Sequence, residues 1–216
     1  MRDTLKAICR STTGLGQRRA RPPLNGKALA TALLLATFAL LSSPNALAQD
    51  ERLADETAAL INNIRQRLDS CAEDGALGEP SVQRVSLAAP HPRPPLAWSE
   101  RLASIASLHG HAMVAQNFFD HVDKKGRTIG QRATDGGYRW RVVGENLAAG
   151  QQTLGDAVRG WLLSSTHCRN LIDERFTEFG IARIDNPSPN DPYGTYWVLV
   201  LGKPQPSSQQ LVSAVR

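Results

Sequence analysis

The six residues from Tyr196 to Leu201, Tyr-Trp-Val-Leu-Val-Leu, constrain the fold of this chain more than any other stretch. A strand with one face in water alternates polar and apolar residues, but this run has no polar residue on either alternate face. We therefore expect both faces of the strand to be covered. Since helical patterns precede it, the sequence predicts an α+β protein, a three-layer α-β-α sandwich in which helices cover both faces of a small antiparallel sheet.

The remaining elements follow from apolar periodicity and from turn residues. Further strands are expected at 176–184 and at 138–143, so that Glu145 lies just beyond a strand. His109 falls on the apolar stripe of a helix, where a hydrogen-bonded core histidine is the more common role. The expected helices are 52–70 with Asp50 as N-cap, 99–117 capped by Ser99, 128–133, and one capped by Thr153 that continues or breaks near Ser164.

The N-terminal segment has the pattern of an export signal. The apolar run 28–41 follows several basic residues and precedes the small-residue pattern Ala46-Leu47-Ala48. A signal-peptide core has about 7–15 apolar residues, whereas a membrane-spanning helix needs about 20. We therefore expect residues 1–48 to be a cleaved signal peptide; an uncleaved N-terminal anchor is the alternative.

Cleavage after Ala48 changes the charge of the protein. The whole chain has a net charge of +5, but residues 1–48 hold seven basic residues and one acidic residue, which leaves 18 basic and 19 acidic residues. No basic surface then favours nucleic acid as a partner. We expect an exported protein, periplasmic or extracellular, with no membrane span after signal cleavage. Its parts would be an N-terminal helix and Pro-rich connector (49–97), a core (98–203) and a flexible tail (204–216).

Two cysteines remain after the predicted cleavage, Cys71 and Cys168. An even number of cysteines in an exported protein favours a disulfide, which would tie the N-terminal helix to the neighbourhood of His167. Two unpaired thiols are the alternative.

Three patches between 118 and 170 place titratable side chains beside apolar residues: Phe118 to His121, Gly144 to Leu147, and Trp161 to Asn170. Their ionisable members are His121, Glu145 and His167. Two imidazoles and a carboxylate are able to form a metal site or a proton-transfer site if they meet in space. Zinc or copper would suit such ligands.

The chain resembles a bacterial domain of the CAP superfamily, which groups cysteine-rich secretory proteins, antigen 5 and plant pathogenesis-related proteins. The resemblance implies the same α-β-α sandwich and a cleft that binds divalent metal in some relatives, with His121, Glu145 and His167 at matching positions. It is carried by five patches in the family's order: 102–121, 144–150, 161–171, 176–180 and 196–202.

The sequence departs from the family pattern at three places. Ser164 lies where the eukaryotic branch has a second acidic residue of the cleft. Ser165-Thr166 replaces the Pro-Gly that usually precedes the bacterial histidine, and Val198-Leu199 replaces a common glutamine.

Three hypotheses about function follow. The first is an exported binding module whose cleft takes a small ligand, a lipid, a divalent metal or an envelope component. The second is a hydrolase of peptide or cell-wall bonds, with Glu145 as general base and the histidines as metal ligands or proton shuttles, or with a Ser164–His167 dyad. The third is structural: Glu145 and Asn146 hydrogen-bond loop backbone next to a strand end. Ser164 and Asn170 are the remaining candidates for residues of the cleft.

Overall fold

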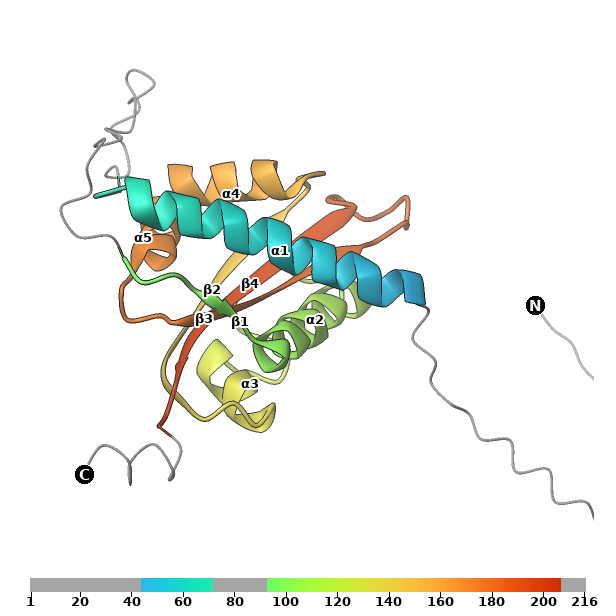
Figure 1. Ribbon diagram of the computed structural model, residues 1–216. Coiled ribbons are helices and arrows are strands. Elements are labelled where there is room, and N and C mark those ends of the chain that lie inside the picture. The colour runs from blue at the N-terminus through green and yellow to red at the C-terminus, as the bar shows by residue number, and fades with distance from the viewer. Residues whose placement is uncertain (1–43, 72–92, 207–216) are drawn as a thin grey trace, which may run out of the picture. The chain divides into compact units, whose positions relative to one another are not determined.

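The middle layer of the protein is a four-stranded sheet in the order β1-β3-β4-β2 (Figure 1). The structure is a computed structural model that describes residues 44–71 and 93–206. β4 pairs antiparallel with β2 and β3, and β1 adds a short parallel pair at the edge of β3. The strands are β1 (Ala97–Trp98), β2 (Trp140–Ala149), β3 (Glu178–Asp185) and β4 (Thr195–Pro204).

Helices cover both faces of this sheet, as the sequence predicted. Side chains of β4 alternate between two apolar clusters, with Trp197, Leu199 and Leu201 in one and Tyr196, Val198 and Val200 in the other. The first cluster lies under α1 (Pro44–Arg67), α4 (Leu154–Leu163) and α5 (Ser165–Ile172), and the second under α2 (Glu100–Ala115) and α3 (Ile129–Asp135). The three-layer α-β-α sandwich is confirmed, with one short parallel pair in the sheet.

Local signals at the helix ends explain where most of the helices begin and stop. The Thr153 side chain accepts a hydrogen bond from the backbone N–H of Asp156 at the start of α4. Thr128 and Gln131 form a capping box at the start of α3, and Gly137 follows this helix with a φ of 74°. Ser164 has an extended backbone, so the chain breaks between α4 and α5.

Two predicted boundaries are wrong. α1 begins at Pro44, so Asp50 lies inside the helix and does not cap it. Proline is tolerated in the first helical turn, and the Ala, Leu and Gln residues that follow favour helix. Glu145 lies inside β2 and not beyond its end, because its backbone pairs with Val200 of the long strand β4.

α1 is fastened to the rest of the sandwich at its C-terminal end. The buried guanidinium of Arg65 donates hydrogen bonds to the carbonyl groups of Pro94, Leu171, Asp173 and Phe176. A disulfide joins Cys71 to Cys168 in α5, as predicted. The α1 helix is therefore held by both a polar and a covalent connection.

Several predicted features lie outside the described residues. These are the apolar run 28–41, most of the connector before Pro94, and the tail beyond residue 206. The predicted cleavage after Ala48 falls within the first turns of α1. Neither of the two described segments contains a helix whose length and apolar character would let it cross a membrane.

Candidate functional site

Glu145 is a buried carboxylate near the middle of β2, with a side chain that is 1% exposed. Its Oε2 accepts a hydrogen bond from Arg132 Nη2 at 2.6 Å, and its Oε1 lies 2.9 Å from His121 Nδ1. A carboxylate at this depth requires compensation of its charge. The Arg132 guanidinium supplies it, and both carboxylate oxygens are engaged.

Arg132 connects the carboxylate to the loop that carries His121. Its Nη1 donates to the backbone carbonyls of His121 and Arg127, both at 2.8 Å, while its Nη2 reaches Glu145. The capped helix α3 holds the guanidinium in this place. Sequence reasoning missed Arg132, because one arginine on a seven-residue helix has no local sign that distinguishes it from a surface arginine.

His121 is the exposed member of the site. Its side chain is 52% exposed, although its Nδ1 is hydrogen-bonded to a buried group. Because a carboxylate only accepts hydrogen bonds, Nδ1 carries the proton, and the neutral ring then has its lone pair on Nε2. Nε2 makes no hydrogen bond to any part of the chain that the structure describes. Glu145 therefore fixes both the tautomer and the orientation of His121.

His167 approaches His121 from α5, and their ring centroids lie 6.2 Å apart. Its helix is tied to β2 through Asn146, whose side chain donates to the carbonyl of His167 at 3.0 Å. Asn170 donates in turn to Asn146 Oδ1 and to the carbonyl of Glu145. Asn146 therefore bonds backbone, as the structural hypothesis expected, although the carbonyl lies in α5 and not in a loop, whereas the Glu145 side chain bonds other side chains. These asparagine bonds position His167.

Ser164 does not fit the predicted dyad with His167. The prediction assumed that the two residues share one helix, at a spacing of three. Ser164 instead joins α4 to α5 in an extended conformation, with a φ of −98° and a ψ of 122°. The helical spacing therefore does not apply. The fold brings together His121, Glu145, His167 and Asn170, and we call these residues and Arg132 the His–Glu cluster.

His109 is a buried residue that contacts the backbone of the loop that carries His121. It is 1% exposed, and its Nε2 lies 2.9 Å from the carbonyl of Asp120. Burial lowers the pKa of His109 from its ordinary value, against the opposing effect of the nearby Glu145 carboxylate. The predicted core role of this histidine is confirmed: it is a neutral, hydrogen-bonded residue that holds the start of the loop.

The chemistry open to the cluster follows from these contacts. Glu145 is poorly placed as a general base, because it is buried and both of its oxygens are occupied. Within residues 44–71 and 93–206 no three His, Cys, Asp or Glu side chains are grouped as metal ligands. His121, with its lone pair on Nε2, is the exposed group of the cluster, and the half-buried His167 ring lies beside it.

Comparison with known proteins agrees with this fold and cluster. The profile of the CAP family, described as the Cysteine-rich secretory protein family, matches residues 58–201. Because this match covers more than half of the chain, the chain belongs to the CAP family. Its fold is an α-β-α sandwich in which a buried Glu–Arg pair lies behind two histidines.

Two proteins of Bacillus subtilis are similar in sequence. The uncharacterized membrane protein YlbC is 29% identical over 116 residues, which are 54% of this chain and 32% of YlbC. The uncharacterized protein YkwD is 29% identical over 94 residues, which are 44% of this chain and 37% of YkwD. The chain thus spans about a third of the length of these relatives.

Two solved structures share the fold. An extracellular protein from Bacillus anthracis that contains a SCP domain aligns with a TM-score of 0.53 and 25% identity, covering 74% of this chain and 44% of that one. An outer surface protein of Borrelia burgdorferi aligns with a TM-score of 0.51 and 20% identity, covering 73% of this chain and 94% of that one. The second likeness concerns the fold alone.

Proposed function

We propose that this chain is an exported binding module that holds its ligand at His121 and His167. The observation that carries the proposal is the Glu145–His121 hydrogen bond, which directs the Nε2 lone pair of an exposed imidazole away from a buried carboxylate. Such a carboxylate–histidine pair favours a metal ion or a hydrogen-bond donor at Nε2. His167, 6.2 Å away between ring centroids, offers a second contact.

Export is supported by three independent observations. The run 28–41 has the length of a signal-peptide core, and a disulfide joins the two remaining cysteines. One similar structure, at 25% identity, is that of a protein described as extracellular. A periplasmic or extracellular location fits all three.

The divalent-metal form of the proposal is tested by calorimetric titration of the full chain with Zn²⁺ and with Cu²⁺. We expect saturable binding at pH 7.5 that weakens at pH 5.5, because metal ions bind the neutral imidazole. His121→Ala should abolish binding, and His167→Ala should weaken it about tenfold, which corresponds to about 1.4 kcal/mol.

The matched control is His111→Ala, since His111 is an exposed histidine on α2 outside the cluster. This variant should bind as the wild type does. Binding that persists in His121→Ala would overturn the assignment of the site. If no metal binds at pH 7.5, the proposal that the ligand is a divalent metal is wrong. The cluster would then bind a small organic or lipid ligand that has a hydrogen-bond donor.

A further inference from the structure

The outer edge of β3 has no partner strand beyond Phe179 among the described residues. β1 pairs with Glu178 and Phe179 and then stops, because the chain turns into α2 after Ser99. Ser99 N–H donates to the carbonyl of Phe179 on this outer side, whereas Asn186 N–H donates to Gly194 on the β4 side. Since backbone groups alternate along a strand, those of Ile181, Arg183 and Asp185 point to this edge. Ile181 is buried, so the accessible groups are those of Arg183 and Asp185.

These edge groups have no partner strand within the described part of the chain. An exposed row of unpaired N–H and C=O groups is a template for pairing with another strand. The stretch from Arg183 to Asp185, whose two end residues are exposed, has the length of the shortest strands. The edge is therefore equipped to accept one more strand beside β3.

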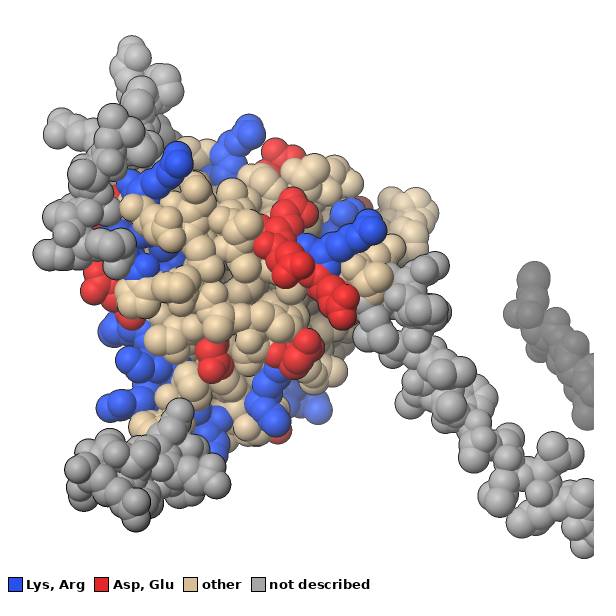
Figure 2. Space-filling view, viewed as in Figure 1, with Lys and Arg blue, Asp and Glu red and all other residues tan. Residues whose placement is uncertain are grey.

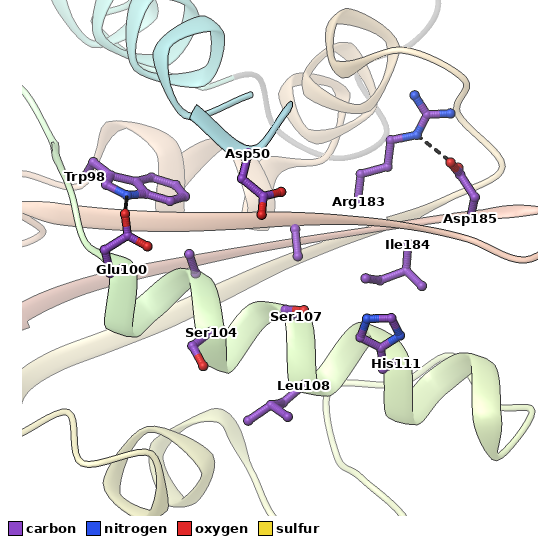
Figure 3. Close-up of a pocket in the computed structure, with 12 residues that line it drawn as sticks. Asp50, Trp98, Glu100, Ser104, Ser107, Leu108, His111, Arg183, Ile184 and Asp185 are labelled. Carbon is purple, nitrogen blue, oxygen red and sulfur yellow. Dashed lines mark hydrogen bonds and ion pairs between the residues drawn. The ribbon is translucent and has the colours of Figure 1, made fainter. Parts of the chain in front are cut away.

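A groove of about 510 Å³ runs along this edge between two helices (Figure 3). One wall is a stripe of α2 at helical spacing, formed by Ser104, Ser107, Leu108 and His111. Asp50 of α1 faces it from the other side, and the pair Trp98 and Glu100 closes the end where β1 stops. The groove thus continues the line of β1.

The α2 wall is fixed in place by close packing on the sheet. Gly180 lies so near the backbone of Leu102 and Ala103 that a Cβ atom there would overlap them. At the other end of the helix, a Cβ on Gly110 would lie 2.6 Å from Ile184 Cγ1. Because both ends of this helix are seated on β3, the groove exists before anything binds in it.

The groove carries a negative charge. Its lining contains the carboxylates of Asp50, Glu100 and Asp185 and the single guanidinium of Arg183, which leaves a net charge of −2 with neutral His111. Arg183 pairs with Asp185 at 3.0 Å and lies over the ring of Trp197. Asp50 and Glu100 have no ion pair with any described residue. Figure 2 shows further acidic side chains over the N-terminal half of α1.

We propose that this groove binds an extended, basic peptide segment of a partner protein, which adds a strand to the open edge of β3. Main-chain hydrogen bonds to Arg183 and Asp185 would supply the affinity that is independent of sequence. Alternate side chains of the peptide would face α1 and α2, where Asp50 and Glu100 select lysine or arginine. This site is separate from the His–Glu cluster and does not depend on the proposed function.

The test titrates the full chain, its disulfide intact, with a fluorescein-labelled octapeptide that repeats Lys-Lys-Val-Val and so carries lysine on both faces of an extended strand. We expect saturable binding that weakens with added salt, since exposed charges contribute to it. Two control peptides keep the length: one replaces lysine with glutamate, and one replaces valine with proline, which has no N–H to donate. Neither should bind. Nuclear magnetic resonance should show shifts of the Arg183 and Asp185 amides and slower hydrogen exchange there.

Variants of the protein test the same edge. Arg183→Pro removes one edge N–H and should weaken peptide binding about tenfold, within the range of a lost hydrogen bond. Arg183→Ala keeps the N–H and removes a positive charge, so it should bind at least as well as the wild type. Asp50→Asn combined with Glu100→Gln should weaken binding and reduce its salt dependence. The control peptides keep the test decisive even if Arg183→Pro does not fold.

Three results would overturn the proposal. The first is equal binding of the lysine and glutamate peptides, and the second is binding of the proline peptide. The third is a concentration-dependent dimer of the wild-type protein that Arg183→Pro abolishes, because the edge would then pair with a second copy of this chain.

Discussion

At the scale of single residues, substitutions in the buried pair of Arg132 and Glu145 should affect the stability of the His–Glu cluster most. Arg132→Met leaves a carboxylate in the core with His121 as its remaining partner. Breaking a buried ion pair in this way typically costs about 3–5 kcal/mol. We expect a loss of this size in the free energy of unfolding, measured by urea denaturation.

Two further variants separate the charge effect from packing. Arg159→Met removes an arginine whose side chain is 76% exposed, and it should change stability by less than about 0.5 kcal/mol. The double variant Arg132→Met with Glu145→Met should recover most of the loss, because it removes both charges. A double variant no more stable than Arg132→Met alone would contradict this account.

Asp191 makes the loop between β3 and β4 sensitive to acid. Burial alone would raise the pKa of this carboxyl group, but hydrogen bonds from the Tyr196 hydroxyl, from the backbone of Tyr193 and Gly194, and from the Asn186 side chain lower its pKa to about 2. An aspartate in an unfolded chain has a pKa of about 3.9. The unfolded state therefore binds this proton more readily, and stability is lost as the pH falls from about 4 to about 2.

We expect Asp191→Asn to be less stable than the wild type at pH 6 and to approach it as the pH falls to 2. Thermal unfolding at intervals across this range would measure the difference. A difference that stays constant from pH 6 to pH 2 would show that the Asp191 carboxylate does not supply this acid-dependent stability.

The cluster shows which residues a sequence can reveal. His121, Glu145 and His167 were identified from their types and their neighbours, and these three side chains do lie together. The role of Arg132 depends on burial that the whole fold creates, so no local pattern marks it. The tautomer of His121 likewise follows from a contact between residues 24 positions apart.

At the scale of elements, two glycines should respond in opposite ways to the same substitution. Gly180→Ala places a methyl group against the α2 backbone, which cannot move aside as a flexible side chain does. We expect a loss of about 3 kcal/mol or more in the free energy of unfolding. Gly160→Ala, in α4 with open space around it, should gain about 0.5–1 kcal/mol from helix propensity.

Chemical denaturation of the two variants side by side provides the measurement. If Gly180→Ala were as stable as the wild type, α2 would not lie as close to β3 as described. The conclusion that α2 forms a fixed wall of the groove would then also be wrong. A loss of stability in Gly160→Ala would instead indicate that another part of the protein contacts α4 at this residue.

The elements also show where sequence patterns stop being informative. The apolar run in β4 predicted both helical layers, because a strand without polar residues on either face must be covered on both faces. The short β-prone run 138–143 predicts a strand that ends before Glu145. Pairing with the long strand β4 overrides that local signal, and β2 continues to Ala149.

At the scale of the whole molecule, the disulfide is the strongest link between α1 and the rest of the sandwich. Cys71 and Cys168 are 97 positions apart, and closing a loop of about this size stabilises a fold by about 4.7 kcal/mol in the chain-entropy model. We expect a reductant, or Cys71→Ser, to lower the urea midpoint of unfolding. Equal midpoints for the oxidised and reduced protein would contradict this expectation.

The position of Cys71 has a consequence for cleavage of this chain by a protease. The disulfide joins the two described segments, 44–71 and 93–206, on either side of the interval 72–92. A protease that cuts once within this interval would therefore produce two polypeptides that remain one covalent molecule. The nicked protein should run as a single band on a non-reducing gel and as two bands after reduction, with α1 still held by the four carbonyl groups that Arg65 contacts.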